Sequence, residues 1–540
     1  MELYVHEKNS VLFDIDENEK QKHMNTAESF LKGKLIVLKG LDSINVTDKI
    51  DWNYEHTNSA NTYKLYLHTL NFIKSLVYAF KKTNDENFQR VARIHLNDWI
   101  QANYSNLNDT EKVWYDHTVS SRVQNIVYYQ IHVDERYKLD SKMFNELITY
   151  HLDFLINPNN YNESNHGIMV DRAIMKVSSL INDENIKEKY LTFAKGRIEK
   201  AILRDYSFKH MHLENSPAYH RMVTKWLIDI AALLEKLESP LNKKYLTKLE
   251  NAEKLNGILI NYNGEFPMIG DTAYVKTNIK KRDNDFIDNE AGIAILNNKQ
   301  TESTLIFNNG FQNNGHKHFD DLSFVLSVRK EQIFVDSGKY NHSSKDPVRK
   351  YLISPHAHNT LTVKNKTYKL ADKFDIELST YLNFGKFKYL AGIHKAYNNV
   401  EIKRIIVSFG GINTIIIDKA RSIDYDEFVQ KFIVNHDVKI NRLNSRTFSI
   451  ETPNQHEYKI TTHNDNTNIE NYYGRKNKAF ISEKFGSIID TNRIEVKQKG
   501  KKVLFITSFL EKNSELKIVK ADHTAVKVKL DDKLFTIPIF

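Results

Sequence analysis

Residues 315–328 read GHKHFDDLSFVLSV, and this stretch marks a change in how the chain is expected to fold. Apolar side chains recur at every second position at Phe324, Leu326 and Val328, which is the pattern of a β-strand with one buried face. Similar alternation continues toward the C-terminus without a long helical pattern between the runs. Because strands without intervening helices pair antiparallel, we expect a mostly antiparallel β domain over residues 286–540.

The first half of the chain has a different apolar period. Apolar residues recur at three- and four-residue spacing from Leu67 to Phe80 and from Val223 to Leu237, as they do in amphipathic helices. Consecutive helices joined by short polar connections pack as antiparallel pairs. The sequence therefore predicts a helical domain over residues 51–285, preceded by a mixed N-terminal segment over residues 1–50.

Size and composition limit the class of protein. A chain of 540 residues exceeds what one hydrophobic core usually serves, so more than one domain is expected. The net charge of +9 suits an anionic partner such as nucleic acid, an anionic glycan or a membrane surface. The basic residues form no dense block, and no nucleic-acid-binding motif is recognised. The chain has no cysteine, which excludes disulfides and thiolate metal ligands.

The N-terminal sequence MELYVHEK, residues 1–8, does not read as a signal peptide, because no apolar run follows a basic start. No window approaches 18 consecutive apolar residues, so no membrane span is expected. We therefore expect either a cytoplasmic protein or a secreted or periplasmic one whose leader has been removed from this chain. The pattern does not indicate an oligomeric state.

Histidine and aspartate residues gather around the opening stretch. His316 and His318 lie two positions apart, so on a strand both would point to the same face. Asp336 follows on the next apolar run, and His358 follows in the stretch HAHNT at residues 356–360. Three such groups from neighbouring strands could close around one metal ion and leave another histidine free for chemistry. This cluster favours an enzyme over a scaffold.

Several motifs, in this order, resemble the heparinase II/III-type polysaccharide lyases, a group that also includes alginate lyases of similar architecture. The motifs are Asn165-His166-Gly167, Glu214–His220, Pro267–Asp271, Gly-His-X-His-X-Asp at 315–320, Val-Asp-Ser-Gly at 335–338 and His-Asn-Thr at 358–360. The resemblance implies an α+β multidomain fold in which an (α/α) toroid precedes stacked antiparallel β-sheets. It also implies an acidic polysaccharide in the cleft between them, cleaved by β-elimination to leave a 4,5-unsaturated uronate.

β-Elimination from a uronate has three requirements: the carboxylate charge must be neutralised, a base must take the C5 proton, and an acid must protonate the departing O4. The resemblance assigns Asn165 and His166 to the neutralising group; alternatively, Asn165 caps a helix that begins near Gly167. Tyr219 is the expected general acid, because a free phenol has a pKa of about 10. The alternative is that Tyr219 is one of many core tyrosines. His316 resembles the remaining catalytic histidine, as base or carboxylate clamp.

The resemblance further implies that His318, Asp336 and His358 hold one divalent metal, most often zinc in that family. Inside the β domain we expect this metal to be structural and to position His316. A hydrogen-bonded His/Asp network without metal is the alternative. The remaining predicted substrate contacts are Arg122, Trp114, His117, Glu214, Tyr340 and Arg349. For Arg122, Tyr340 and Arg349 the alternative is a surface or packing role, and for Glu214 it is a pairing at the helix start.

The sequence thus predicts a polysaccharide lyase for a uronate polymer, either glycosaminoglycan-like or a bacterial capsular polysaccharide. Two alternatives stay open. A glycoside hydrolase on the same toroid needs two carboxylates facing one bond, for which Glu214, Glu265 and Asp271 are candidates. A non-catalytic acidic-glycan-binding protein would need neither Tyr219 nor His316. The pattern indicates neither the polymer nor endo or exo action.

Overall fold

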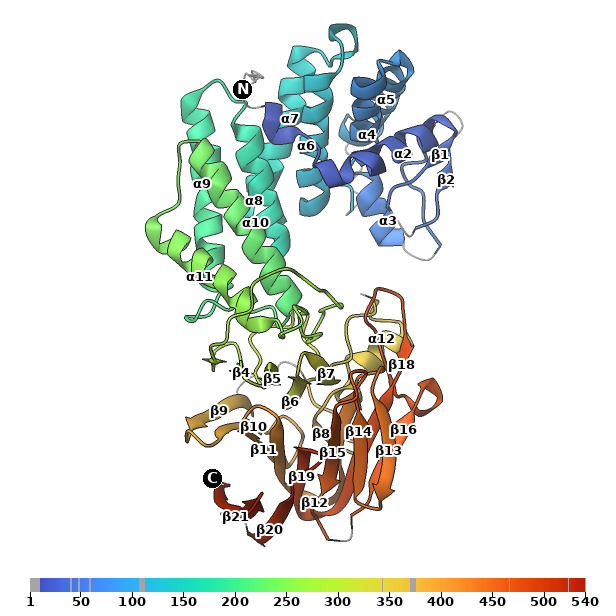
Figure 1. Cartoon of the computed structure of the whole chain (residues 1–540). Coiled ribbons are helices and arrows are strands. Elements are labelled where there is room, and N and C mark those ends of the chain that lie inside the picture. The colour runs from blue at the N-terminus through green and yellow to red at the C-terminus, as the bar shows by residue number, and fades with distance from the viewer. Residues whose placement is uncertain are drawn as a thin grey trace. The chain divides into compact units, whose positions relative to one another are not determined.

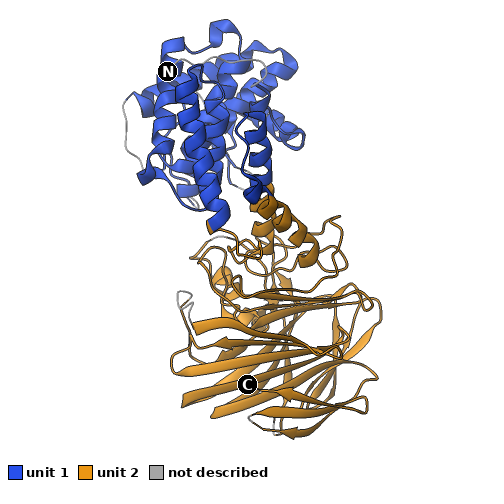
Figure 2. Ribbon diagram, turned by 90° about the vertical axis from the view of Figure 1, so that its left-hand side faces the viewer, with its two compact units in different colours: residues 1–203, 226–246 blue, residues 204–225, 247–540 orange. Residues whose placement is uncertain are grey.

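The computed structural model describes residues 10–38, 41–46, 49–57, 60–105, 112–341, 343–369, 375–465, 467–522 and 524–539. The chain separates into two compact units, coloured blue and orange in Figure 2. Unit 1 comprises residues 1–203 and 226–246, and unit 2 comprises residues 204–225 and 247–540. This division differs from the predicted boundary after residue 285, because two segments of the first half pack with the β-sheets.

Unit 1 is helical, as its apolar period predicts. Its helices are α2 (Lys20–Leu31), α3 (Ala60–Leu67), α4 (Asn71–Thr83), α5 (Glu86–Trp99), α6 (Asp116–His132), α7 (Ser141–Ile156), α8 (Asn165–Ser178) and α9 (Glu184–Arg204). Two more helices, α10 (Pro217–Lys236) and α11 (Lys243–Leu259), contribute residues to both units. Helix α4 packs against α2, α5 and α6, and α6 packs against α7 and α8 (Figure 1). None of the helices in the described ranges is long and apolar enough to cross a bilayer.

Part of the segment expected as an N-terminal preamble belongs to the helical core. Phe30 of α2 stacks on Phe72 of α4 with ring centroids 5.0 Å apart, and both side chains are buried. A short antiparallel pair, β1 (Lys34–Leu35) and β2 (Ile44–Asn45), follows α2. Since α2 shows a weaker apolar repeat than α4, its place in the core could not be inferred from periodicity.

Unit 2 is built on antiparallel strands, as predicted. The main sheet runs in the order β13-β14-β15-β19-β12-β7-β6-β5-β4-β3, and the ladders between its named strands are antiparallel. Its strands along this path are β3 (Phe286–Asp288), β4 (Ile293–Asn298), β5 (Ser303–Asn308), β6 (Ser323–Val328), β7 (Glu331–Phe334), β12 (Asn413–Val434), β13 (Lys439–Asn444), β14 (Thr447–Glu451), β15 (Glu457–Thr462) and β19 (Asn492–Glu511).

Further strands branch from this path. They are β8 (Leu361–Val363), β9 (Ile376–Asn383), β10 (Lys388–His394), β11 (Val400–Phe409) and β16 (Ile469–Tyr473). A two-stranded pair, β17 (Phe480–Ile481) with β18 (Ile489–Asp490), and a three-stranded sheet, β20 (Leu516–Ala521), β21 (Ala525–Leu530) and β22 (Lys533–Pro538), complete the strands. Phe324, Phe334, Phe432 and Phe509 pack in the largest apolar cluster of the unit. The loops that leave β5 and β7, with the short helix α12 (Pro347–Leu352), carry the candidate site.

Candidate active site and buried metal-binding cluster

His316 and His318 lie in the loop between β5 and β6, not on a strand as predicted. His316 has a left-handed backbone (φ 56°), which a strand does not allow. The side chain of Lys317 between them is buried in ion pairs with Asp320 and Asp321, the latter at 2.9 Å. This buried charge cluster fixes the loop, so the two histidines are oriented by the loop rather than by strand alternation.

Asp271 joins the two histidines. Its Oδ2 lies 3.1 Å from His316 Nδ1, and its Oδ1 lies 3.1 Å from His318 Nε2. Arg349 Nη1 contacts the same Oδ1 at 2.5 Å. Burial acts to raise the pKa of Asp271, but the hydrogen bonds to His316 and His318 and the nearby positive charges hold that pKa well below its ordinary value. Asp271 is therefore a carboxylate at neutral pH, shared between two imidazoles and a guanidinium.

Gly270 allows Asp271 to reach this position. Its φ is 55°, and a Cβ added there would lie 2.4 Å from the carbonyl oxygen of Asn215 and 2.7 Å from that of His316. Any other residue would clash with both backbones. The Asn215 amide in turn donates to the carbonyls of Asn313 and Gly315 at 3.0 and 2.9 Å, which fixes the loop ahead of His316. Three chain segments thus meet at the imidazole.

Tyr219 lies in the first turn of α10, two residues after Pro217 at the helix start. Its ring stacks on the imidazole of His316, with centroids 3.4 Å apart and planes 18° from parallel. Tyr219 is partly exposed, whereas Tyr206 nearby in the sequence is a buried core tyrosine. Burial, then the carboxylates of Asp271 and Glu214, raise the pKa of the phenol to about 12. Tyr219 therefore carries its proton at neutral pH.

Glu214 contacts the other side of His316. Its Oε2 lies 3.4 Å from His316 Nε2, and 15% of its side chain is exposed. His316, with 20% of its side chain exposed, thus has a carboxylate at each ring nitrogen. The contact to Asp271 is shorter, so Nδ1 is the better-fixed nitrogen and Nε2 the one available for proton exchange. Substrate contact by Glu214 stays a prediction.

His318, Asp336 and His358 form the one group of potential metal ligands found among the described residues. All three are buried, and one ligand atom from each lies within 4.8 Å of the others. His318 Nδ1 and His358 Nε2 have no hydrogen-bond partner among the described residues. The opposite nitrogens contact carboxylates: His318 Nε2 contacts Asp271, and His358 Nδ1 contacts Asp336 Oδ1 at 3.0 Å. Imidazoles that ligate metals through one nitrogen usually hydrogen bond through the other in this way, so the cluster fits a metal ion.

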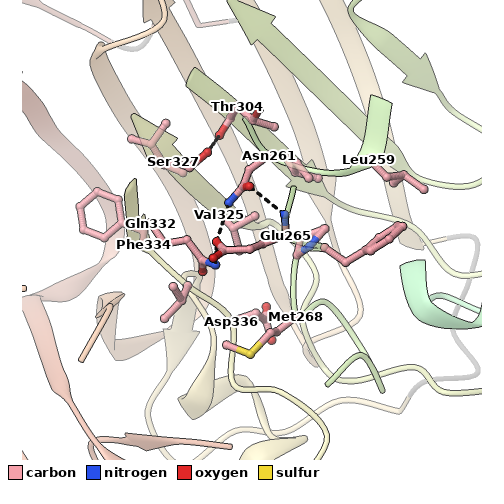
Figure 3. Close-up of a pocket in the computed structure, with 15 residues that line it drawn as sticks. Leu259, Asn261, Glu265, Met268, Thr304, Val325, Ser327, Gln332, Phe334 and Asp336 are labelled. Atoms are coloured by element: carbon pink, nitrogen blue, oxygen red, sulfur yellow. Dashed lines mark hydrogen bonds between the residues drawn. The ribbon is translucent and has the colours of Figure 1, made fainter. Parts of the chain in front are cut away.

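A cavity of about 30 Å³ lies beside Asp336, lined by Met268, Phe334 and the side chain of Glu265 (Figure 3). The Glu265 carboxylate accepts hydrogen bonds from Asn261, Asn263, Tyr274 and Gln332, at 2.8 to 3.0 Å. A buried carboxylate with four donors is a structural anchor for the segment that leads to Asp271. This saturation counts against Glu265 as an acid of a glycoside hydrolase.

The predicted carboxylate-neutralising residues lie in unit 1, at the start of α8. Ser164 is the N-cap, and its hydroxyl accepts the His166 N–H at 3.2 Å, so the alternative that Asn165 caps the helix is wrong. The rings of His166 and His117 lie 5.4 Å apart, and Nδ1 of each has no partner in the described part of the chain. Trp114 is half-buried and packs against Tyr150, with ring centroids at 4.8 Å. Convergence of these residues with Tyr219 and His316, which belong to unit 2, stays a prediction.

Arg122 does not fit its predicted role as a substrate contact. Its side chain is fully buried in unit 1, with the guanidinium carbon 4.4 Å and 4.7 Å from the ring centroids of Trp99 and Trp114. Its Nε donates to His151, and one Nη donates to the carbonyls of His68 and Val113. The guanidinium therefore joins helices and loops inside the unit. A packing role, the alternative to substrate contact for this residue, fits these contacts.

Arg349 and Tyr340 are the predicted contacts on the β side. Arg349 comes from α12, and its Nη1 contacts Asp271 and donates to the Lys339 carbonyl at 2.8 Å. With 11% of its side chain exposed, Arg349 mainly holds Asp271 in place. Tyr340 is half-buried with a left-handed backbone (φ 58°), and its contact with substrate stays a prediction.

Comparison with known families identifies the chain. The family model described as heparinase II/III N-terminus matches residues 1–291, and that described as heparinase II/III-like, C-terminal, matches residues 282–518. This chain belongs to the heparinase II/III family. Members of this family are polysaccharide lyases, so the protein is an enzyme of that class. A search of curated protein sequences finds no match.

Solved structures with this fold include a heparinase III, with a TM-score of 0.81 and 16% identity over 98% of this chain and 92% of that one. A heparan sulfate lyase from Pedobacter heparinus has a TM-score of 0.71 and 15% identity, covering 97% and 90%. A second heparinase III, with methylated lysines, has a TM-score of 0.76 and 15% identity, covering 99% and 92%. These likenesses confirm the predicted fold class, a helical domain followed by antiparallel β-sheets.

Proposed function

We propose that this heparinase II/III-family enzyme cleaves a uronate-containing, glycosaminoglycan-like polysaccharide by β-elimination. The observation that carries the proposal is the stack of Tyr219 on His316, at 3.4 Å, with Asp271 fixing the imidazole. A phenol and an imidazole in contact provide an acid and a base that can act on neighbouring atoms of one sugar.

In the proposed reaction, His316 Nε2 removes the C5 proton of the uronate. Asp271 keeps the other proton of the ring on Nδ1, in the way a carboxylate orients a catalytic histidine. Tyr219 protonates O4 as the C4–O4 bond breaks, and the electrons of the C5–H bond form the C4–C5 double bond. The raised pKa of Tyr219 supports its assignment as the acid, and Glu214 stabilises the imidazolium that forms.

The neutralisation of the substrate carboxylate is assigned to Asn165 and His166. An amide N–H can donate to the carboxylate, and the charge that develops on it in the transition state strengthens that bond. The open Nδ1 of His166 supports this role, because a buried polar atom without a partner is uncommon.

His318, Asp336 and His358 would hold the metal, which we propose to be zinc, since two imidazoles and a carboxylate are suitable zinc ligands. When bound, the metal would have a structural role. His318 also contacts Asp271, so fixing His318 fixes the carboxylate that orients His316.

The test is incubation of the enzyme with heparan sulfate, chondroitin sulfate, hyaluronan and alginate while the ultraviolet absorbance of the new double bond is followed. A rise with a sulfated glycosaminoglycan, lost in Tyr219→Phe, is expected. Cleavage that yields saturated ends would indicate a hydrolase and overturn the proposed chemistry. Binding of these polymers without cleavage would support the non-catalytic alternative.

A further inference from the structure

A three-stranded sheet, β20-β21-β22, lies near the C-terminus (Figure 1). One of its faces is apolar and the other is cationic. Val526, Val528, Leu530 and Ile537 point inward and join an apolar cluster with strands of the main sheet. The exposed positions between them are occupied by lysines: Lys527 and Lys529 on β21, opposite Lys520 and Lys517 on β20. The outer face therefore carries two lysine pairs in direct cross-strand register.

A β-bulge builds this arrangement. The register shifts between Ile518 and Lys520, so that Ile518 faces Val528 and Lys520 faces Lys527. Without the extra residue, Val519 would stand opposite Lys527. A bulge re-aims the side chains that follow it, and here it turns a lysine onto the outer face. The four lysines stand on strands whose backbones lie roughly 5 Å apart, at positions about 7 Å apart along β21.

Fold stability does not account for these pairs, because like charges directly opposite each other destabilise a sheet. Lysines on an edge strand protect against aggregation, and this explains Lys517 and Lys520 on β20. It does not explain Lys527 and Lys529, since β21 is the central strand. Asp522 and Asp532 in the flanking turns contact Lys520 and Lys529 at 3.2 and 2.7 Å. Among the described residues, neither Lys517 nor Lys527 forms an ion pair.

We propose that this lysine face, Lys517, Lys520, Lys527 and Lys529, binds the anionic polysaccharide chain outside the site of cleavage. The inference rests on the proposed function, which supplies a polymer with one carboxylate or sulfate after another. A polysaccharide with regularly repeating anionic groups can pair with the four regularly spaced lysines, and it releases its counterions on binding. Thr536 and Leu534 continue the two rows on β22 and offer a hydroxyl and an apolar contact to a sugar.

The experiment uses the full-length enzyme with all four lysines replaced by glutamine. Binding of a long heparan sulfate chain is measured across a salt series, and cleavage of that chain is compared with cleavage of a heparan sulfate tetrasaccharide. The magnitude of the slope of log affinity against log salt should fall by at least about 1, because fewer counterions are released. The kcat/KM for the long chain should fall while that for the tetrasaccharide is unchanged.

Two controls separate a specific face from total charge and from misfolding. Replacing four exposed lysines elsewhere, Lys200, Lys243, Lys244 and Lys299, with glutamine removes the same charge and should leave the salt slope unchanged. Replacing the four lysines of the face with arginine keeps the charge and should keep the binding. Equal salt slopes for the glutamine variant and the wild type would overturn the proposal, as would stronger binding to anionic lipid vesicles or duplex DNA than to the polysaccharide. Wild-type binding without cleavage of any uronate polymer would refute the proposed function alone.

Discussion

The candidate-site histidines of the two units are held in different ways. In unit 2, Asp271 contacts both His316 and His318, and Asp336 contacts His358. In unit 1, His117 and His166 contact each other's rings, and their Nδ1 atoms have no partner among the described residues. Imidazoles oriented by carboxylates are prepared for proton transfer or metal binding. His318 and His358 also have one open nitrogen each, so the difference lies in the carboxylate on their other nitrogen. In the described part of the chain, neither His117 nor His166 has such an ion pair, and their open Nδ1 atoms are suited to contact a ligand.

The largest expected effect comes from removing the carboxylate of Asp271, which contacts both His316 and His318 in unit 2. Asp271→Asn keeps the shape but removes the charge that orients His316, and kcat should fall roughly 10⁴-fold, as it does when a triad aspartate is replaced. Thermal stability should also fall, since the nearly buried Arg349 loses its partner. Steady-state kinetics and thermal unfolding measure both effects. Asp288→Asn, which changes another buried aspartate of unit 2, serves as control and should leave kcat within a few-fold of wild type.

The predicted carboxylate-binding residues of unit 1 are tested at Asn165. Removing its amide in Asn165→Ala should lower kcat roughly 10²-fold, because a hydrogen bond that strengthens in the transition state is lost. Ser164→Ala is the matched variant: it removes the N-cap of the same helix and should reduce stability by about 1 kcal/mol with little effect on kcat. If both variants lose activity equally, Asn165 acts only through the helix.

Much of the fold and of the candidate site in the two units could be predicted from the sequence. The contacts that could not be predicted share one cause. The change of apolar period predicted the helical and β regions, and the motifs predicted the His318, Asp336 and His358 cluster. The bridge from Asp271 to His316 spans 45 residues and depends on the backbone of Gly270, which no local pattern reveals. The choice between substrate contact and packing for Arg122 depends on two tryptophans brought together by folding. Local periodicity thus predicts the helices and strands, whereas the side chains that contact each site residue are set by tertiary folding.

The proposed metal site is tested by comparing two buried histidines of unit 2. His358→Gln should remove the bound metal and lower the Tm, because ligand-metal bonds contribute directly to folding free energy. His220 is buried too, but its nitrogens hydrogen bond with the backbone of His212 and Ala252. His220→Gln should therefore keep the metal even if the Tm falls. Elemental analysis of protein purified without chelator decides the matter, and a wild-type chain free of metal would refute the assignment.

The smallest expected effect concerns the helix that carries Asn165. Asp171 of α8 is buried and accepts a hydrogen bond from Tyr161 at 2.8 Å, with Arg197 at 3.5 Å. Burial raises its pKa to about 7, despite Arg197 and Tyr161. The folded state therefore binds more protons than the unfolded state at mildly acidic pH, and stability contributed by the protonated carboxyl is lost as the pH rises toward 7. Asp171→Asn should flatten this part of the Tm–pH profile between about pH 4 and pH 7. An unchanged slope of Tm against pH in the variant would mean that Arg197 keeps Asp171 charged. The buried carboxylate of unit 1 would then be ion-paired in the folded state, as Asp271 is in unit 2.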